Sequence, residues 1–207
     1  SRHIIELRFA NDFTPILPGA ISPGQRLYQR LLELTSDLPY RFVNNWDDLP
    51  THLLIQSTDL CTGTGVVFNA GDMTPAIRSS MTIPLLFDPF VIDTLKLIDG
   101  GITSNMPVNL AREMSDGVVV VVDVSAELNR FKTPPQPWQI VDQVTTILER
   151  ETNRKSRLAA DLLVTPQIEE TPEDKDDYIS LVQAGKDAMQ ESIPNLRKLL
   201  DTKRGAG

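Results

Sequence analysis

The sequence is poor in cysteine, in histidine and in long apolar runs. Its 207 residues include one cysteine, Cys61, and two histidines. A single cysteine excludes an internal disulfide and a metal site of clustered cysteines. No apolar run approaches the roughly 18 residues that a membrane-spanning helix needs, so we expect no transmembrane segment. No signal-peptide core follows the first residues, and we expect the chain to begin inside a protein.

Positive charge is also scarce. The chain has 28 Asp and Glu against 20 Lys and Arg, a net charge of −8, and its pI is about 4.8. Nucleic-acid binding depends on basic patches, so we expect no nucleic-acid partner. Charge alone would also not hold the chain on anionic lipid. A hydrophobic content of 41% is typical of a globular protein with a core.

The second half of the sequence alternates strands and helices. Five valines at 118–122 indicate a strand buried on both faces, as in the middle of a parallel sheet. Pro194 is expected to kink or split the last helix. The pattern predicts an α/β fold with a mainly parallel sheet. The expected elements are strands at 95–98, 118–122 and 162–164, and helices from Pro107, over 137–158 and over 178–200.

The first half predicts shorter elements. After an irregular start, a helix is expected over 24–35, and Thr74 is expected to cap a helix that runs to Met81. Strands at 53–55 and 66–68 are expected to form a hairpin through 59–65. The two glycines in that connection fit a turn better than a dinucleotide loop. The acidic segment 169–177 lacks a calcium-loop pattern and is expected to be a solvated loop.

One triplet, Asp99-Gly100-Gly101, follows a predicted strand and could carry chemistry. A carboxylate at a strand end, beside glycines that permit close backbone approach, suits a general base. The same triplet also suits a simple turn in which Asp99 is the cap. The residues alone leave both interpretations open.

A nucleophile is harder to find. The sequence contains no G-x-S-x-G elbow, and Ser22 lies in a glycine-rich stretch with the wrong spacing, which favours a turn or cap. His3 and His52 are poor candidates for a triad, and His52 is expected at the surface. If acyl chemistry occurs, an aspartate must act directly on the nucleophile.

Several segments together resemble the patatin-like phospholipase family, in the family's order and over nearly the whole chain. Residues 57–63 (STDLCTG) are similar to its A-T-D-L-x-T-G, and 71–84 (GDMTPAIRSSMTIP) to its G-D-L-x-x-A-[VI]-R-A-S-M-[SA]-I-P. Residues 97–108 (LIDGGITSNMPV) resemble L-V-D-G-G-x-x-N-N-[LM]-P-V, and 119–125 (VVVVDVS) resemble V-I-A-V-D-V-S. Weaker similarities lie at 18–25, 160–166 and 184–185.

The resemblance implies a three-layer patatin-like fold with a mainly parallel central sheet flanked by helices, incomplete at its N-terminal side. Residues 1–203 would be the C-terminal part of one domain, and 204–207 a tail. The family's G-x-S-x-G serine and its oxyanion loop lie upstream of the matched segments, so the missing N-terminal segment is an expected partner. Ser79 replaces a usual alanine, and Leu85-Leu86 replace a common Gly-Val.

The implied activity is that of a serine acyl hydrolase, a phospholipase A or lipid esterase, with a Ser–Asp dyad. Asp99 would be the base, flanked by Gly100 and Gly101; no metal and no cofactor are implied. The chain alone is expected to be inactive. Its substrate would be a lipid or phospholipid ester. A possible acyl-chain wall is formed by Met81, Ile83, Leu85, Leu86 and Met106, and the favoured alternative is that most of them are plain core.

Two other hypotheses stay open. One is a catalytically dead patatin-like domain used for binding or assembly, and the other is an unrelated α/β domain that binds a small molecule. The resemblance is strongest to bacterial members, which favours the bacterial envelope or secretion and leaves the cytoplasm open. It also allows contact with a membrane interface.

Overall fold

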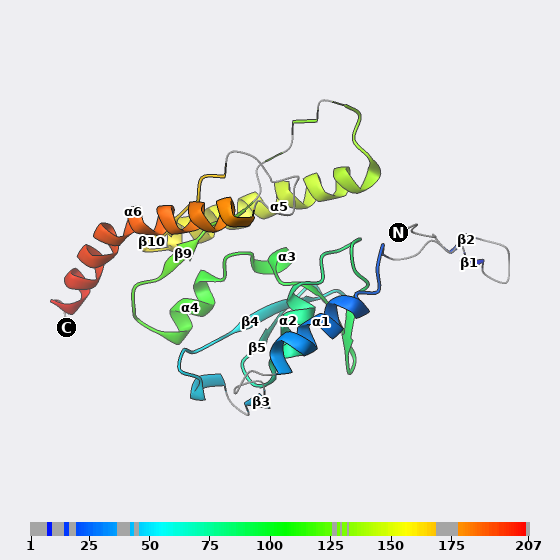
Figure 1. Cartoon of the computed structure of the whole chain (residues 1–207), viewed down its shortest axis with the longest axis horizontal. Helices are drawn as coiled ribbons and strands as arrows, with labels where there is room; N and C mark the ends of the chain where they lie inside the picture. The colour runs from blue at the N-terminus through cyan, green and yellow to red at the C-terminus, as the bar shows by residue number, and fades with distance from the viewer. Residues whose placement is uncertain are drawn as a thin grey trace. The chain divides into compact units, whose positions relative to one another are not determined.

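The structure is a computed structural model of the whole chain. It divides into two compact units, Ser1–Thr103 and Ser104–Gly207, which are described separately (Figure 1). The acidic segment 169–177, most of the irregular start with His3, and the last two residues lie outside the described residues. The described residues are 8–9, 15–16, 20–36, 42–43, 46–125, 128, 130–131, 133–168 and 178–205.

The first unit is built on a four-stranded sheet in the order β5-β4-β8-β7. All three pairings are antiparallel, and the predicted hairpin is confirmed as β4 and β5. The expected parallel direction is therefore wrong for this sheet. Short turns join β4 to β5 and β7 to β8, and strands joined in this way pair antiparallel. The strands are β4 (Ile55–Asp59), β5 (Gly65–Phe68), β7 (Phe90–Ile92) and β8 (Leu95–Asp99).

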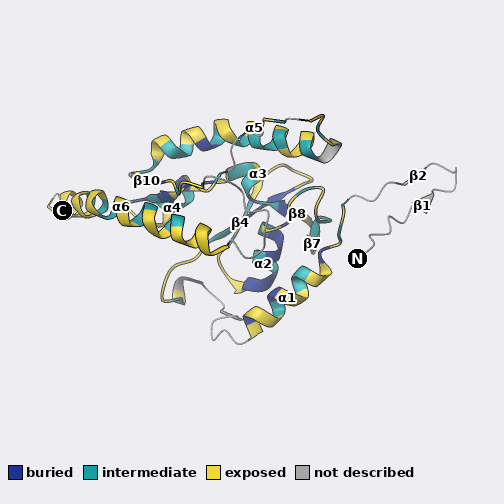
Figure 2. Cartoon of the chain, turned by 45° about the horizontal axis from the view of Figure 1, so that its top comes forward, coloured by how far each residue is buried: buried dark blue, intermediate teal, exposed yellow. Residues whose placement is uncertain are grey.

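Two helices cover this sheet. The predicted helix at 24–35 is confirmed as α1 (Gln25–Ser36), which packs on α2 (Met73–Ser80), and α2 packs on β4 and β8. Figure 2 shows that α2 is mostly buried, whereas α1 keeps an exposed face. The unit also contains β1 (Arg8–Phe9) paired with β2 (Pro15–Ile16), β3 (Phe42–Val43) paired with β6 (Gly71–Asp72), the 3-10 helix at Trp46–Asp48 and α3 (Gly101–Ser104).

Helix α2 begins earlier than predicted. Its cap is Asp72, whose extended backbone lets the carboxylate accept the Thr74 N–H at 2.9 Å. Thr74 itself is fully buried and its hydroxyl lies 2.9 Å from the Thr35 hydroxyl of α1. Trp46 is 0% exposed and packs against Met73 and Ala76 of this helix.

The second unit holds a parallel pair of strands, β9 (Val120–Val122) and β10 (Leu162–Val164). The α/β class is therefore confirmed: among the described residues, the four-stranded sheet and two further strand pairs are antiparallel, and the pair of β9 with β10 is parallel. Burial of the valine strand on both faces is wrong, because Val121 is buried while Val122 is 56% exposed. The helices are α4 (Val108–Met114), α5 (Pro137–Ala159) and α6 (Tyr178–Arg204).

Helix α6 continues through Pro194 as one element, so the expected split is wrong. A proline removes a single N–H donor, and the hydrogen bonds on either side still hold the helix. The helix also includes Arg204, the first residue of the expected tail.

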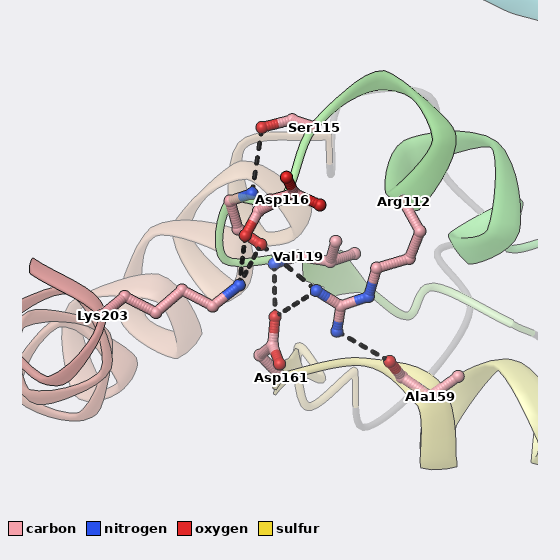
Figure 3. Close-up of polar contacts among 8 residues, drawn as sticks. Arg112, Ser115, Asp116, Val119, Ala159, Asp161 and Lys203 are labelled. Atoms are coloured by element: carbon pink, nitrogen blue, oxygen red, sulfur yellow. Dashed lines mark hydrogen bonds and ion pairs between the residues drawn. The ribbon is translucent and has the colours of Figure 1, made fainter. Parts of the chain in front are cut away.

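An ion pair joins the ends of three elements in the second unit (Figure 3). The Asp161 carboxylate accepts from Arg112 Nη1 at 2.8 Å and from the Val119 N–H at 2.7 Å. Arg112 Nη2 also donates to the Ala159 carbonyl at 3.1 Å. The Arg112 contact, with help from the Val119 N–H, lowers the pKa of Asp161 from its usual 3.8 to about 2.

The turn after α4 is held from two sides (Figure 3). Lys203 Nζ, from the end of α6, donates to the Asp116 and Gly117 carbonyls, and Arg112 donates to the Gly117 carbonyl at 3.2 Å. The Ser115 hydroxyl accepts the Gly117 N–H at 3.0 Å. The turn, α4, α6 and Asp161 therefore form one polar cluster.

We predict that Asp161→Asn lowers the free energy of unfolding at neutral pH by about 1 kcal/mol, because the amide carries no charge to pair with Arg112. A carboxyl group whose pKa is lower in the folded protein stabilises the fold at pH values above its unfolded-state pKa. That stabilisation is lost as the pH falls through the folded-state pKa. The deficit should therefore shrink between about pH 4 and pH 2. Urea titrations at several pH values measure it.

The matched control for this substitution is Glu151→Gln. Glu151 pairs with Arg154 on α5 at 2.8 Å, but both side chains are about 60% exposed. Exposed pairs of this kind contribute little, so no clear change in stability is expected. An Asp161→Asn deficit that stays constant down to pH 2 would contradict the role given to the ion pair.

Candidate active site

Asp99 is the last residue of β8 and is half-buried. Its N–H donates to the Thr82 carbonyl at 2.9 Å, just after α2, and its carbonyl accepts from Thr58 Oγ1 at 2.9 Å. In the sheet it lies opposite Ser57 of β4. The main chain of Asp99 is thus fixed by the neighbouring strand and by the segment that leaves α2.

The carboxylate of Asp99 uses one oxygen to form a turn. Oδ1 accepts the N–H of Gly101, the first residue of α3, at 2.8 Å. Oδ2 makes no hydrogen bond or ion pair with any residue that the structure describes. The side chain is therefore oriented as a turn cap and still offers one oxygen to another group.

Gly100 allows β8 to end against β4. A Cβ at this position would lie 2.2 Å from the Gln56 carbonyl oxygen and 2.7 Å from its carbon. Both atoms belong to the backbone of a paired strand, so they have little freedom to move away. Of the triplet seen in the sequence, Gly100 provides the close approach and Gly101 provides the N–H that orients Asp99.

Hydroxyl groups support the same strand ends. Thr58 Oγ1 lies 3.0 Å from Thr103 Oγ1, and Gln56 Nε2 donates to Thr103 Oγ1 at 3.0 Å. Beneath them the Ser57 and Ser79 hydroxyls are 2.8 Å apart. Both serines are fully buried, so neither is presented to a substrate. Sequence reasoning gave none of these residues a role, although Ser57, Thr58 and Ser79 lie in the quoted motifs.

The other residues that the sequence analysis considered for catalysis form a turn or lie at the surface. The Ser22 hydroxyl accepts the Gly24 N–H at 3.1 Å, which confirms the turn interpretation. His52 is exposed, as predicted. Within the described part of the chain, no group of His, Cys, Asp and Glu is arranged to hold a metal ion. Nor is any helix there long and apolar enough to cross a membrane.

Arg78 is a buried cation that sequence reasoning missed. It is 1% exposed, and its guanidinium carbon lies 5.0 Å from the Phe87 ring centre and 5.4 Å from that of Phe90. Nη1 donates to Thr82 Oγ1 at 2.6 Å. Burial lowers the pKa of Arg78. Gly24 leaves room for it, because a Cβ there would lie 1.9 Å from Nη2.

Four of the five residues expected in an acyl-chain wall follow α2 on the exposed surface. Met81, Ile83, Leu85 and Leu86 are 42%, 48%, 42% and 39% exposed. They come directly after the helix and flank Thr82, which binds the Asp99 N–H. The fifth, Met106, is 6% exposed and belongs to the core of the second unit, in line with the alternative of plain core.

Comparison with known proteins gives matches of two kinds. The family model described as patatin-like phospholipase matches residues 2–112. Uncharacterized NTE family proteins of Mycobacterium bovis and Mycobacterium tuberculosis are 30% identical over 100 residues, which is 48% of this chain. The matched part is 16% of the length of these relatives.

The close approach at Gly100 leads to a prediction on stability. Gly100→Ala should lower the free energy of unfolding by roughly 1–3 kcal/mol, since the new methyl group would displace the β4 backbone. Gly185→Ala is the control, because no atom lies within 4 Å of a Cβ there and alanine favours a helix. Urea melts of both variants measure the difference, and equal stability would disprove the contact.

Proposed function

Because the chain belongs to the patatin-like phospholipase family, we propose that it forms part of a serine acyl hydrolase that acts on lipid esters, as a phospholipase A or a lipid esterase. The proposal rests on the position of Asp99 and on its hydrogen bonds. This residue ends a central strand, its backbone is fixed on both sides, and one of its two carboxylate oxygens is already oriented by Gly101. The mycobacterial relatives are much longer than the matched part, which allows a nucleophile outside this chain.

In the proposed reaction, a serine hydroxyl outside this chain attacks the ester carbonyl while Asp99 takes its proton. The new bond joins the serine oxygen to the acyl carbon. The bond to the alcohol breaks, and the alcohol leaves with the proton from Asp99. Water then attacks the acyl-enzyme, again with Asp99 as base, and releases the fatty acid and the free serine.

The surroundings of Asp99 agree with this chemistry. The backbone contacts hold the carboxylate while Oδ2 faces no partner among the described residues, so a serine hydroxyl has an acceptor. The exposed side chains of Met81, Ile83, Leu85 and Leu86 offer an apolar wall next to the segment that binds Asp99. Backbone N–H groups outside this chain would stabilise the oxyanion, by roughly 3–4 kcal/mol per donor.

The alternative is a catalytically dead patatin-like domain that serves binding or assembly. The sequence upstream of this chain distinguishes the two hypotheses, because a G-x-S-x-G elbow there would support the hydrolase and its absence there would support the dead domain. The full-length protein also distinguishes them, because only the hydrolase forms a covalent acyl-enzyme.

We expect the 207-residue chain alone to show no esterase activity, since it lacks an elbow serine and its buried Ser57 and Ser79 cannot reach an ester. The test is hydrolysis of a p-nitrophenyl ester by the purified chain. Turnover that survives purification and disappears with Ser22→Ala would show that the chain has its own nucleophile.

In the full-length protein, Asp99→Asn should reduce turnover by about 10²–10⁴-fold, because the amide keeps the Gly101 contact but cannot accept a proton. Circular dichroism should show an intact fold. A variant that keeps more than about a tenth of the activity would make Asp99 a turn residue only.

Two matched substitutions accompany this test. The first is Asp93→Asn. Asp93 lies in the β7–β8 turn with a φ of 52°, a conformation that asparagine adopts readily, so turnover and stability should both be unchanged. Asp123→Asn removes the acceptor of a 2.5 Å hydrogen bond from Arg157. It should therefore lower stability rather than the rate of the chemical step.

A further inference from the structure

Two residues other than glycine have a positive φ in the described part of the chain, Leu85 at 68° and Asp93 at 52°. Asp93 lies in the two-residue turn between β7 and β8, and aspartate adopts this conformation with little strain. The Cβ of any residue other than glycine crowds the backbone in this conformation, and aspartate can offset the cost with a local hydrogen bond from its side chain. Leucine has no polar side-chain atom with which to do so. The strain at Leu85 therefore needs a separate explanation.

The backbone around Leu85 is held by a neighbouring segment. The Leu85 carbonyl accepts the Ile21 N–H at 2.8 Å, and the Leu86 carbonyl accepts the Ser22 N–H at 3.0 Å. The Phe87 N–H closes the turn on the Ile83 carbonyl at 3.0 Å. All these bonds use main-chain atoms, and a glycine at position 85 would make them without strain.

What leucine adds at this position is an apolar side chain, which folding buries only in part. The residue is 42% exposed, so a large part of its apolar surface stays outside the core. Strained backbone that the surrounding structure holds in place is characteristic of functional sites. The exposed part of the side chain is therefore available for contact with something other than the core.

The position of the turn indicates what that contact is. Thr82, which accepts the Asp99 N–H, is three residues before Leu85. Around the same turn, Ile21 is 69% exposed, Ile83 48% and Leu86 39%. An apolar surface that begins beside the candidate base suits the hydrocarbon part of an ester.

We infer that Leu85 determines specificity by contacting the acyl chain of the bound ester, so that longer chains are favoured over short ones. This inference rests on the proposed function. A contact of this kind changes selectivity, because each methylene in an apolar site adds to transition-state binding. Leu85 takes no part in proton transfer.

The experiment compares kcat/KM for p-nitrophenyl octanoate and butanoate, both dissolved as monomers, in the full-length protein. Leu85→Gly and Leu85→Asn should lower the octanoate-to-butanoate ratio roughly tenfold. Leu85→Met, which keeps an apolar side chain, should retain the ratio. Leu85→Gly should melt at the same temperature as the wild type or higher, since glycine removes the strain.

Asp93→Gly is the matched control, because it relieves the other positive φ without removing an apolar group. Its ratio should equal that of the wild type. An unchanged ratio in Leu85→Gly and Leu85→Asn would overturn the inference, as would an equal loss on both esters or a lower melting temperature for Leu85→Gly.

Two further outcomes separate the inference from its premise. A loss seen only with lipid vesicles, and not with dissolved esters, would assign Leu85 to surface attachment and overturn its role in selectivity. If the wild-type protein hydrolyses neither ester, the proposed function fails and the inference fails with it. If the wild type hydrolyses the esters and the octanoate-to-butanoate ratio is unaltered in the variants, the inference fails and the proposed function stands.

Discussion

The first unit depends on one backbone contact, the approach of Gly100 to β4. A side chain at this position would lie 2.2 Å from the Gln56 carbonyl oxygen, so β8 can end where it does only with glycine there. β4 is an inner strand of the sheet and also packs against α2. The contact therefore fixes the main chain of Asp99 against an inner strand of the sheet, and a candidate general base needs to be held in place in this way.

Helix α2 fixes the other side of Asp99 at an energetic cost. Arg78 is buried with two aromatic rings and a hydroxyl as its neighbours, and loss of solvent lowers its pKa. The rings and the 2.6 Å bond to Thr82 Oγ1 offset part of that cost. In return Arg78 holds Thr82, whose carbonyl binds the Asp99 N–H. A motif residue with no role in the sequence interpretation thus supports the candidate base through one intermediate residue, Thr82.

Sequence patterns predicted the features that depend on local chemistry. Apolar spacing predicted α5 and β10, and the glycines after Asp59 predicted the hairpin. The position of Asp99 at a strand end followed from three residues. Some failures were local, such as the cap at Asp72 and the helix that continues through Pro194. Other features depend on distant contacts: the turn at Leu85 is held by hydrogen bonds to 21–22, more than sixty residues away. No local pattern carries such information.

The comparison of two aspartates shows what the structure adds. Asp99 ends β8 and Asp123 follows β9, so both read in the sequence as a carboxylate after an apolar strand. Asp123 is 5% exposed and binds Arg157 at 2.5 Å and the Ser125 N–H at 3.0 Å. Burial alone would raise the pKa of Asp123, but the bonds from Arg157 and Ser125 outweigh it and the net shift is downward. A carboxylate engaged in this way is a weak base with no oxygen to spare, whereas Asp99 has one oxygen oriented and another available. The availability of an oxygen, rather than the residue type or its place after a strand, is what makes Asp99 the better candidate.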